Sequence, residues 1–422
     1  MSSTLKYNLV HITTGGEYKT PLVASQLFDQ AQCQAVNKGI HAPHKTEAWV
    51  IGAMREYIDI PSQSTISNLS IRCPDIRIRM INGISRLQSF PVMALMKFYR
   101  TLLGTKTPVI YHCRGTDATE WALKLKKHYP QDKVVMDVRG YWPAEKLYEN
   151  GIEYPELATG TDKELYVSLN NRLKDILLKA DALTTVSNAL RTLLINELGA
   201  TQQCAVVPCC VSQITPDDKR NELRKEWGVK DGELLLVYSG TTAAYQHLED
   251  LTIPFMKELS EKDEKIKLVF FSSQIDKIKS MLIAASIDPD KVILKSFQQT
   301  EVAAALTACD AGILIRKPTL VNRVANPVKI AEYLAAGLPI IIEREVGGVA
   351  DEMFDKKILQ GITITQKNAH IPTQASETLK WLGENTTQRR QDVRDYVSKV
   401  YLWSAAIHVS RKLYQGALSN RT

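Results

Sequence analysis

Two charged residues, Lys329 and Glu332, stand in a stretch that is otherwise typical of a buried packing unit, ANPVKIAEYLAAGLPIII over 325–342. Asn326 suits the N-cap of a helix, and Pro327 suits its first position. The free amide groups at such a helix start bind phosphate, and a lysine in the first turn adds a cation. Glu332 follows Lys329 on nearly the same face of the helix. The spacing fits a site for a phosphorylated ligand, and taken alone it fits a solvent-exposed ion pair equally well.

More cations precede this helix in the stretch LIRKPTLVNRVANPVK. Arg316, Lys317 and Arg323 follow a short apolar run over 311–315, which predicts a strand. Ligands of open α/β sheets bind beyond the carboxyl ends of the strands. We therefore expect these side chains and Lys329 to converge on one phosphate-sized region.

Glycine turns follow the first predicted strand in each half of the chain. Gly15 and Gly16 stand in TTGGEYKT, and Gly240 and Thr241 stand in YSGTTAAYQH. Glycine lets a backbone approach a ligand closely, although many loops after strands use it for geometry alone. We expect both loops to contribute to ligand binding.

Charged and aromatic residues also crowd the end of the strand predicted over 134–138. Asp137 and Arg139 stand in DVRGYWPAE, and His112 lies in the strand predicted over 109–113. These three are the candidate catalytic residues, in the role of orienting a reactant. The alternative is that Asp137 and Arg139 only pair with each other.

Short apolar runs alternate with helical patterns along almost the whole chain, which predicts parallel sheets built from strand, helix and strand units. The strands expected in the first half are 9–12, 109–113, 134–138, 182–186 and 205–207, and residues 38–79 are harder to parse. Those expected in the second half are 234–238, 267–271, 292–295, 311–315, 339–342 and 362–364. Two doubly wound α/β domains joined near 211–220 follow from this order.

The composition narrows the class of protein. The 422 residues carry a net charge of +7, which suits an anionic ligand or an acidic membrane surface and is too weak to indicate nucleic acid. Seven cysteines are scattered without a C-x-x-C pair, which predicts a reducing cytoplasm and no cysteine metal site. The first residues do not resemble a signal peptide, and no run of 18 apolar residues predicts a membrane span.

The chain resembles the retaining glycosyltransferases of family 4, which have the two-domain GT-B fold. The resemblance is carried by the segment around Glu332, by EVGGVADEMFD, by ADALTTVSNALRTLLINELG with AVVPCCV, and by the end of the chain, VYLWSAAIHVSRKLYQGAL. It implies two facing Rossmann-like domains with an interdomain cleft. We expect an acceptor-side domain over 1–212, a nucleotide-sugar domain over 213–395, and a helix over 396–422 that packs back towards the first domain.

The departures from the family pattern concern charged positions. The family commonly has a first glutamate eight positions before Glu332, where this chain has Val324, so it resembles a subset that lacks this residue. The family also usually places arginine and lysine after the Gly240 loop, where this chain offers Thr241, Thr242, Gln246 and His247. Arg316 or Arg323 would then supply the charge for a diphosphate.

The resemblance implies sugar transfer from a nucleotide-sugar donor to a glycan or lipid-linked acceptor, with retention and without a metal or other cofactor. Glu332 would accept the ribose hydroxyls, and Lys329, Arg316, Arg323 and the helix start at Asn326 would bind the diphosphate. Bacterial surface polysaccharide synthesis is the implied setting. Two alternatives are a catalytically silent sugar-nucleotide or glycan-binding partner and a GT-B sugar-nucleotide epimerase.

One segment suggests contact with a membrane. SRLQSFPVMALMKFYRTLLGTK over 85–106 mixes large apolar residues with Arg86, Lys97, Arg100 and Lys106. Such a helix predicts weak, salt-sensitive attachment to an anionic surface, where a peripheral enzyme would meet a lipid-linked acceptor. An ordinary core helix between two strands is the alternative.

Overall fold

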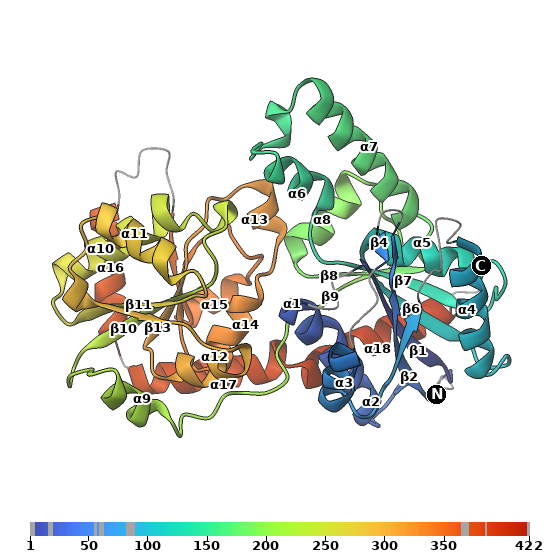
Figure 1. Ribbon diagram of the computed structural model, residues 1–422, viewed down its shortest axis with the longest axis horizontal. Helices are drawn as coiled ribbons and strands as arrows, with labels where there is room; N and C mark the ends of the chain where they lie inside the picture. The colour runs from blue at the N-terminus through green and yellow to red at the C-terminus, as the bar shows by residue number, and fades with distance from the viewer. Residues whose placement is uncertain are drawn as a thin grey trace. The chain divides into compact units, whose positions relative to one another are not determined.

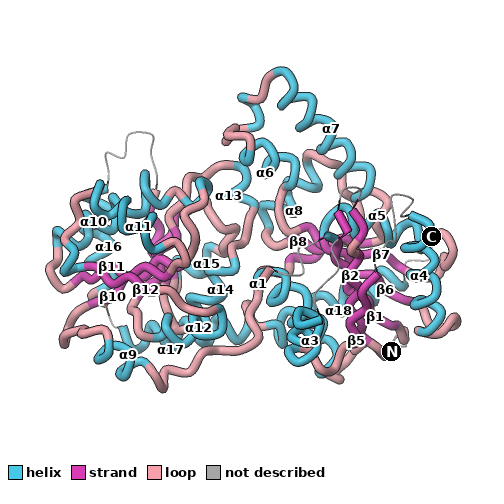
Figure 2. Tube along the Cα trace, viewed as in Figure 1, coloured by secondary structure: helices cyan, strands magenta, loops and turns pink. Residues whose placement is uncertain are grey.

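The structure is a computed structural model that describes residues 5–15, 20–54, 57–58, 63–81, 89–363, 371–384 and 386–419. The chain divides into two α/β units (Figure 1). The first consists of Met1–Ser212 and Leu402–Thr422, and the second consists of Gln213–Tyr401. Each unit is built around one parallel sheet (Figure 2), which confirms the predicted fold class.

The first unit has a parallel sheet in the order β5-β2-β1-β6-β7-β8-β9. These strands are β1 Asn8–Thr14, β2 Thr46–Ile51, β5 Arg77–Ile81, β6 Val109–Arg114, β7 Lys133–Val138, β8 Ala182–Thr185 and β9 Cys204–Val206, and a short hairpin pairs β3 Ala53–Met54 with β4 Tyr57–Ile58. The helices are α1 Pro21–Val23, α2 Asp29–Val36, α3 Gln63–Arg72, α4 Ser89–Leu102, α5 Gly115–Lys126, α6 Trp142–Glu149, α7 Gly160–Leu177, α8 Asn188–Asn196 and α18 Trp403–Ser419.

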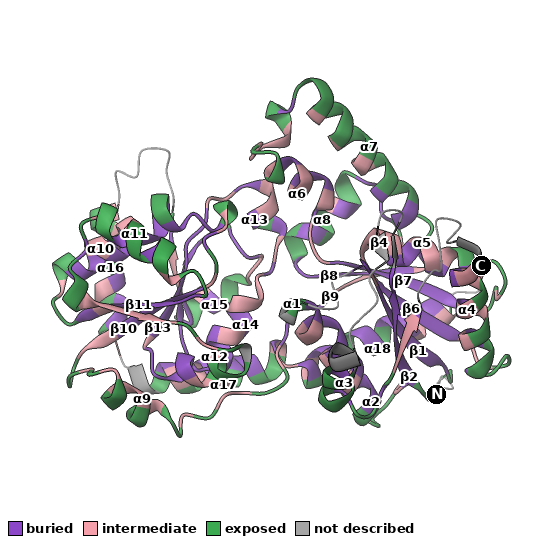
Figure 3. Cartoon of the chain, viewed as in Figure 1, coloured by how far each residue is buried: buried purple, intermediate pink, exposed green. Residues whose placement is uncertain are grey.

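Alternating side chains of this sheet enter two different hydrophobic clusters. Val10 and Ile12 pack with residues of α4 and α5, whereas Leu9 packs with Leu413 of α18. Helices therefore cover both faces, as a parallel sheet requires. Figure 3 shows the inner strands of the sheet buried, while much of α7 is exposed.

The second unit has a parallel sheet in the order β12-β11-β10-β13-β14-β15. Its strands are β10 Leu234–Ser239, β11 Ile266–Phe271, β12 Val292–Lys295, β13 Ala311–Leu314, β14 Ile340–Glu343 and β15 Leu359–Ile362. Its helices are α9 Arg220–Glu226, α10 Ile253–Lys262, α11 Ile275–Ala284, α12 Gln299–Thr307, α13 Leu320–Val324, α14 Val328–Ala335, α15 Asp351–Asp355, α16 Ile371–Leu382 and α17 Thr386–Val400.

Strands β2 and β5 occupy the region that the sequence left unparsed. Glu47 and Arg79 interrupt their apolar pattern, yet the two side chains pair at 2.8 Å, and the Trp49 indole donates to Glu47 at 2.9 Å. Charge within these strands is thus neutralised inside the protein. The strand predicted over 362–364 differs from β15, which spans Leu359–Ile362. Residue 364 lies outside the described residues.

The chain crosses between the units at two adjacent points. Val211 forms an isolated parallel bridge with Leu402, and the Trp403 amide donates to the Val211 carbonyl at 3.1 Å. We expected the last helix to start at 396, but α17 continues to Val400, because Val393 and Val397 are buried in the second unit. The helix that packs on the first unit is α18.

Helix α4 packs as a core helix on the first sheet. Val92 and Met96 on its buried face, and Leu103 directly after it, join the hydrophobic cluster. Arg100 is fully buried and pairs with Asp132 at 2.6 Å. Phe98 and Leu102 remain 57% and 48% exposed. Among the helices that the structure describes, none combines the length and apolar character needed to cross a bilayer.

Candidate functional site

Helix α14 carries Lys329 and Glu332, and its start differs from the prediction. The helix begins at Val328, so Pro327 rather than Asn326 occupies the N-cap position, and no side chain caps it. The Asn326 amide is buried and donates to the Gly347 carbonyl at 2.9 Å. Asn326 therefore ties two loops together. At the other end, Gly337 has the positive φ of 74° that the predicted helix stop requires.

The position of α14 is set by Tyr333, which is almost completely buried. Its hydroxyl accepts a hydrogen bond from the Ser239 amide at 2.8 Å, at the end of β10. A Cβ atom at Gly312 of β13 would lie 2.4 Å from the Tyr333 ring. The helix can approach the two central strands this closely because residue 312 is glycine.

Lys329 and Glu332 meet at this edge of the sheet. Lys329 Nζ lies 2.8 Å from Glu332 Oε2 and 3.3 Å from Ser239 Oγ. The side chains of Lys329 and Glu332 are only 22% and 18% exposed. The pair is therefore held against the carboxyl end of β10, unlike an ordinary solvated pair on a helix surface.

Asn322 connects the loops around this pair. Its side-chain amide donates to the Lys317 carbonyl at 3.0 Å and to the Tyr245 carbonyl at 3.4 Å. Its own carbonyl accepts from the Gly347 amide at 3.1 Å. The loops after β10, β13 and β14 are thus joined. No motif in the sequence singled out Asn322, because its partners are distant in the chain.

The predicted cations occupy different surroundings. Arg316 is buried, with its guanidinium 5.3 Å from the centre of the Tyr245 ring. Arg323 is half exposed and pairs with Glu345 at 2.5 Å, so its charge is already offset. Arg316 and Lys329 are less exposed than Arg323, and Lys329 is in turn paired with Glu332.

The glycine loops are ordered by hydrogen bonds. The Gly240 amide donates to the Phe271 carbonyl at 3.0 Å, and the Tyr238 hydroxyl donates to the Thr241 carbonyl at 2.6 Å. In the first unit, Gly15 ends β1 with a φ of 65°. Gly16 lies outside the described residues.

The three candidate catalytic residues of the first unit lie together at the carboxyl ends of β6 and β7. Asp137 lies 3.8 Å from His112 Nε2 and 3.7 Å from Arg139 Nη1, and it accepts a 2.8 Å hydrogen bond from the Thr184 hydroxyl. Arg139 also donates to Gln26 Oε1 at 2.8 Å. Asp137 and Arg139 do pair, as the alternative interpretation required, but within a larger polar cluster.

Burial decides what each of these groups can do. His112 and Asp137 are almost inaccessible, whereas the Arg139 side chain is 11% exposed. Burial alone would raise the pKa of Asp137, but Arg139 and then His112 hold that pKa well below its ordinary value. Burial, with His112 adding to the effect, lowers the pKa of the adjacent His11. Of these three residues, Arg139 is therefore best able to contact a ligand. The buried Asp137 carboxylate lies beside its guanidinium.

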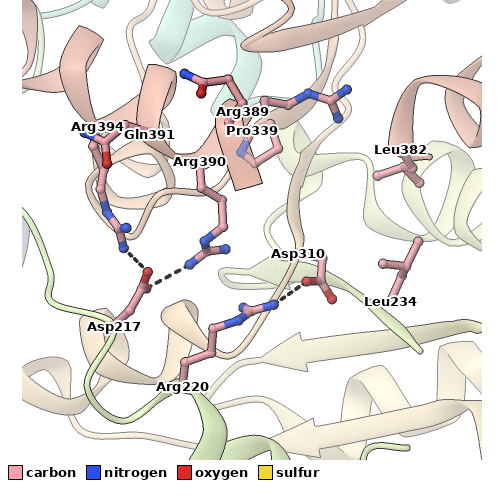
Figure 4. A pocket seen from close by; sticks show the side chains of 11 residues that line it. Asp217, Arg220, Leu234, Asp310, Pro339, Leu382, Arg389, Arg390, Gln391 and Arg394 are labelled. Carbon is pink, nitrogen blue, oxygen red and sulfur yellow. Dashed lines mark hydrogen bonds and ion pairs between the residues drawn. The ribbon is translucent and has the colours of Figure 1, made fainter. Parts of the chain in front are cut away.

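A cavity of about 380 Å³ lies elsewhere in the second unit (Figure 4). Its residues Leu234, Asp310 and Pro339 stand at or just before the amino ends of strands, opposite the Lys329 edge. Arg220 binds Asp310, and Arg390 donates to Asp217 and to the Ala336 carbonyl at the end of α14. These arginines neutralise aspartates and helix ends, which is a structural role.

No group of three or more His, Cys, Asp or Glu side chains that could hold a metal ion occurs among the residues that the structure describes.

The contact between Gly312 and Tyr333 generates a prediction for stability. A Gly312→Ala substitution should lower the free energy of unfolding of the second unit by about 1 to 3 kcal/mol, because the new methyl group overlaps a buried ring. Gly383→Ala is the control, since its Cβ would meet only backbone atoms at 3.6 Å or more. Urea unfolding of both variants measures the difference. Equal stability of the two would show that α14 has room to move.

Residues 219–400 match the family described as glycosyl transferases group 1. No curated protein matched the sequence.

Several solved structures resemble the whole chain. A glycosyltransferase from Rickettsia africae ESF-5 has a TM-score of 0.68 at 13% identity, covering 99% of this chain and 100% of that one. Sucrose-phosphate synthase from Thermosynechococcus elongatus has a TM-score of 0.66 at 14% identity, with the same coverage. WaaG, a glycosyltransferase involved in lipopolysaccharide biosynthesis, has a TM-score of 0.57 at 13% identity, covering 98% and 100%. The chain therefore has the GT-B fold, and the group 1 match over most of its second unit supports a glycosyltransferase.

Proposed function

We propose that this protein is a retaining, metal-independent glycosyltransferase of family 4 that moves a sugar from a nucleotide-sugar donor to a glycan or lipid-linked acceptor. The observation that carries the proposal is the contact of Lys329 with Glu332 and Ser239 at the carboxyl edge of the second sheet. This edge lies within the segment that matches the group 1 glycosyl transferases. The likeness of the fold to WaaG favours a role in bacterial surface polysaccharide synthesis.

Glu332 has the chemistry to hold the ribose of a donor. A carboxylate can accept hydrogen bonds from two neighbouring hydroxyl groups, and such charge-assisted bonds are stronger than neutral ones. Lys329 fixes one carboxylate oxygen at 2.8 Å, which limits the rotation of the glutamate side chain before a ligand arrives. The Glu332 carboxylate would therefore already be oriented to accept hydrogen bonds when the ribose arrives.

Lys329 and Arg316 have the charge to hold the diphosphate. An ammonium group has three N–H donors. Glu332 and Ser239 take two of them in the described structure, so the third can donate to a phosphate oxygen. Negative charge builds on the diphosphate as the glycosidic bond breaks, and fixed cations stabilise that transition state more than the ground state.

Retention follows if the acceptor enters on the face that the diphosphate leaves, with the departing phosphate oxygen taking the acceptor's proton. Such a reaction requires no strong protein nucleophile. On the first unit, Arg139 would orient a reactant, and Asp137 and His112 would hold Arg139. The contact of 3.7 Å between Asp137 and Arg139 supports this division of roles.

The ribose contact gives the sharpest prediction. Glu332→Ala should weaken binding of a nucleoside diphosphate by tenfold or more, because each charge-assisted hydrogen bond contributes about 1.5 to 3 kcal/mol. Glu332→Gln should lose less, since its amide oxygen still accepts one hydroxyl. Titration calorimetry with a panel of nucleoside diphosphates measures both effects. Glu258→Ala is the control, because Glu258 is a partly buried i,i+4 partner of Lys262 in the same unit.

A 2′-deoxyribose donor completes this test as a double-mutant cycle. The deoxy donor should bind the wild type less well and lose much less additional affinity with Glu332→Ala, because the partner of the hydroxyl is already gone. Fully additive penalties would show that Glu332 does not contact that hydroxyl. Transfer or hydrolysis of the intact donor would exclude a catalytically silent binding protein.

Asp137→Asn tests the first-unit cluster. The substitution keeps the shape but removes the charge that faces Arg139, so kcat should fall by tenfold or more while nucleotide affinity changes little. Asp181→Asn is the matched control, because it removes a charge that pairs with Lys126 at the start of β8. Near-ultraviolet circular dichroism establishes that both variants are folded. An unchanged kcat in folded Asp137→Asn would leave the cluster with a structural role only.

We also propose weak contact of the first unit with an anionic membrane through the exposed residues of α4. Phe98 and Leu102 lie one turn apart and are exposed, and Lys97 and Lys106 stand nearby in the sequence. A peripheral enzyme would meet a lipid-linked acceptor there.

The vesicle experiment follows from these exposed residues. Binding to anionic vesicles should exceed binding to neutral ones at low salt and should weaken as salt is added. Phe98→Asn should reduce it several-fold, whereas Ile283→Asn, at an exposed residue of the second unit, should not. Co-sedimentation measures the bound fraction. Equal partitioning to both vesicle types would contradict membrane contact.

A further inference from the structure

Helix α18, at the end of the chain, reaches the candidate catalytic cluster through Tyr414. Its hydroxyl oxygen lies 2.9 Å from His112 Nδ1, and the two rings meet edge to face at 5.9 Å. Tyr414 is fully buried in a cluster with Leu9 and Ile110 of the sheet. Helix α18 thus places the Tyr414 hydroxyl against His112, on the face of the sheet that α18 covers.

The two ring nitrogens of His112 face groups of different kind. Nε2 lies 3.8 Å from the Asp137 carboxylate, and Nδ1 faces the Tyr414 hydroxyl. Burial, with Tyr7 and Asp137 adding to the effect, raises the pKa of Tyr414, so the hydroxyl keeps its hydrogen. A carboxylate favours an N–H group opposite it, and a hydroxyl can donate to an unprotonated nitrogen. The arrangement favours hydrogen on Nε2 and none on Nδ1.

The other charged and titratable groups around His112 agree with this assignment. His11 of β1 lies beside it, with ring centres 4.9 Å apart, and burial disfavours the charged form of His11. Burial would raise the pKa of the Asp137 carboxyl, but Arg139, His112 and Arg114 lower it. Asp137 therefore remains an anion for the Nε2 hydrogen to face.

We infer that Tyr414 is a positioning residue, which holds His112 in the Nε2-protonated tautomer and so fixes the arrangement of Asp137 and Arg139. The inference rests on the proposed function for its effect on turnover, but the tautomer itself is a property of the folded chain. Helix α18 then orients the His112, Asp137 and Arg139 cluster, in addition to contributing to the hydrophobic core of the first unit.

Tyr7 provides a matched control for the hydroxyl of Tyr414. Both tyrosines are buried in the same hydrophobic cluster, and their rings lie 5.9 Å apart. The Tyr7 hydroxyl donates to the His41 carbonyl at 2.9 Å instead. Tyr7→Phe and Tyr414→Phe thus remove the same atom from the same cluster, and only the second removes the partner of His112.

The first measurement is the tautomer of His112 in the full chain. With ¹⁵N-labelled histidine, the ring-nitrogen signals of His112 would be distinguished from those of the other seven histidines by their loss in His112→Gln. We expect the wild type and Tyr7→Phe to show unprotonated Nδ1 and protonated Nε2. In Tyr414→Phe a second tautomer should become populated, because Nδ1 has lost its donor. An unchanged His112 signal in Tyr414→Phe would overturn the inference.

The second measurement is steady-state transfer by the same proteins. Tyr414→Phe should lower kcat about tenfold with donor KM unchanged, and Tyr7→Phe should change neither. Equal loss of kcat in both variants, or no loss in Tyr414→Phe, would overturn the positioning role. If the wild type transfers no sugar from any nucleotide donor, the proposed function fails, and the histidine spectra still decide the inference.

Discussion

Helices cover both faces of each sheet, so a polar side chain within a strand must find its partner inside the protein. In the first unit this constraint acts on His112 and Asp137, which cannot reach solvent and instead contact Tyr414, Thr184 and Arg139. In the second unit the strands carry few such groups, and the charges gather beyond the strand ends. The same architecture thus yields a buried polar cluster in one unit and a partly exposed one in the other.

The partly exposed cluster, which contains Lys329 and Glu332, depends on a glycine and a backbone amide of the central strands. Gly312 lets Tyr333 approach the sheet, and Tyr333 in turn holds the Ser239 amide. The same residue, Ser239, accepts the contact from Lys329. A ligand that binds Lys329 and Glu332 would therefore contact side chains that are fixed to the two central strands. Such fixed groups suit a site that must hold a diphosphate in one reactive geometry.

Much of the fold was predictable because buried parallel strands form continuous apolar runs that stand out between helices. Strands β2 and β5 were missed because Glu47 and Arg79 break that pattern, and only the folded chain brings these two charges together. The role of Asn326 was misassigned because a capping residue and a loop-tying residue look alike in sequence. Lys329 and Glu332 were predictable since they are neighbours on one helix. The contact of Tyr414 with His112 was not, because no local pattern relates residues 302 positions apart.

The isolated bridge between Val211 and Leu402 marks where the chain leaves the first unit and where it returns. The second unit is one continuous segment, whereas the first needs residues from both ends of the chain. During synthesis a domain near the amino end usually completes its folding first. Here that order is inverted, because α18 follows the whole second unit in the chain. Until α18 has been synthesised, Leu9, Ile110 and Val135 lack their covering helix, so the core of the first unit cannot be completed before the second unit has been made.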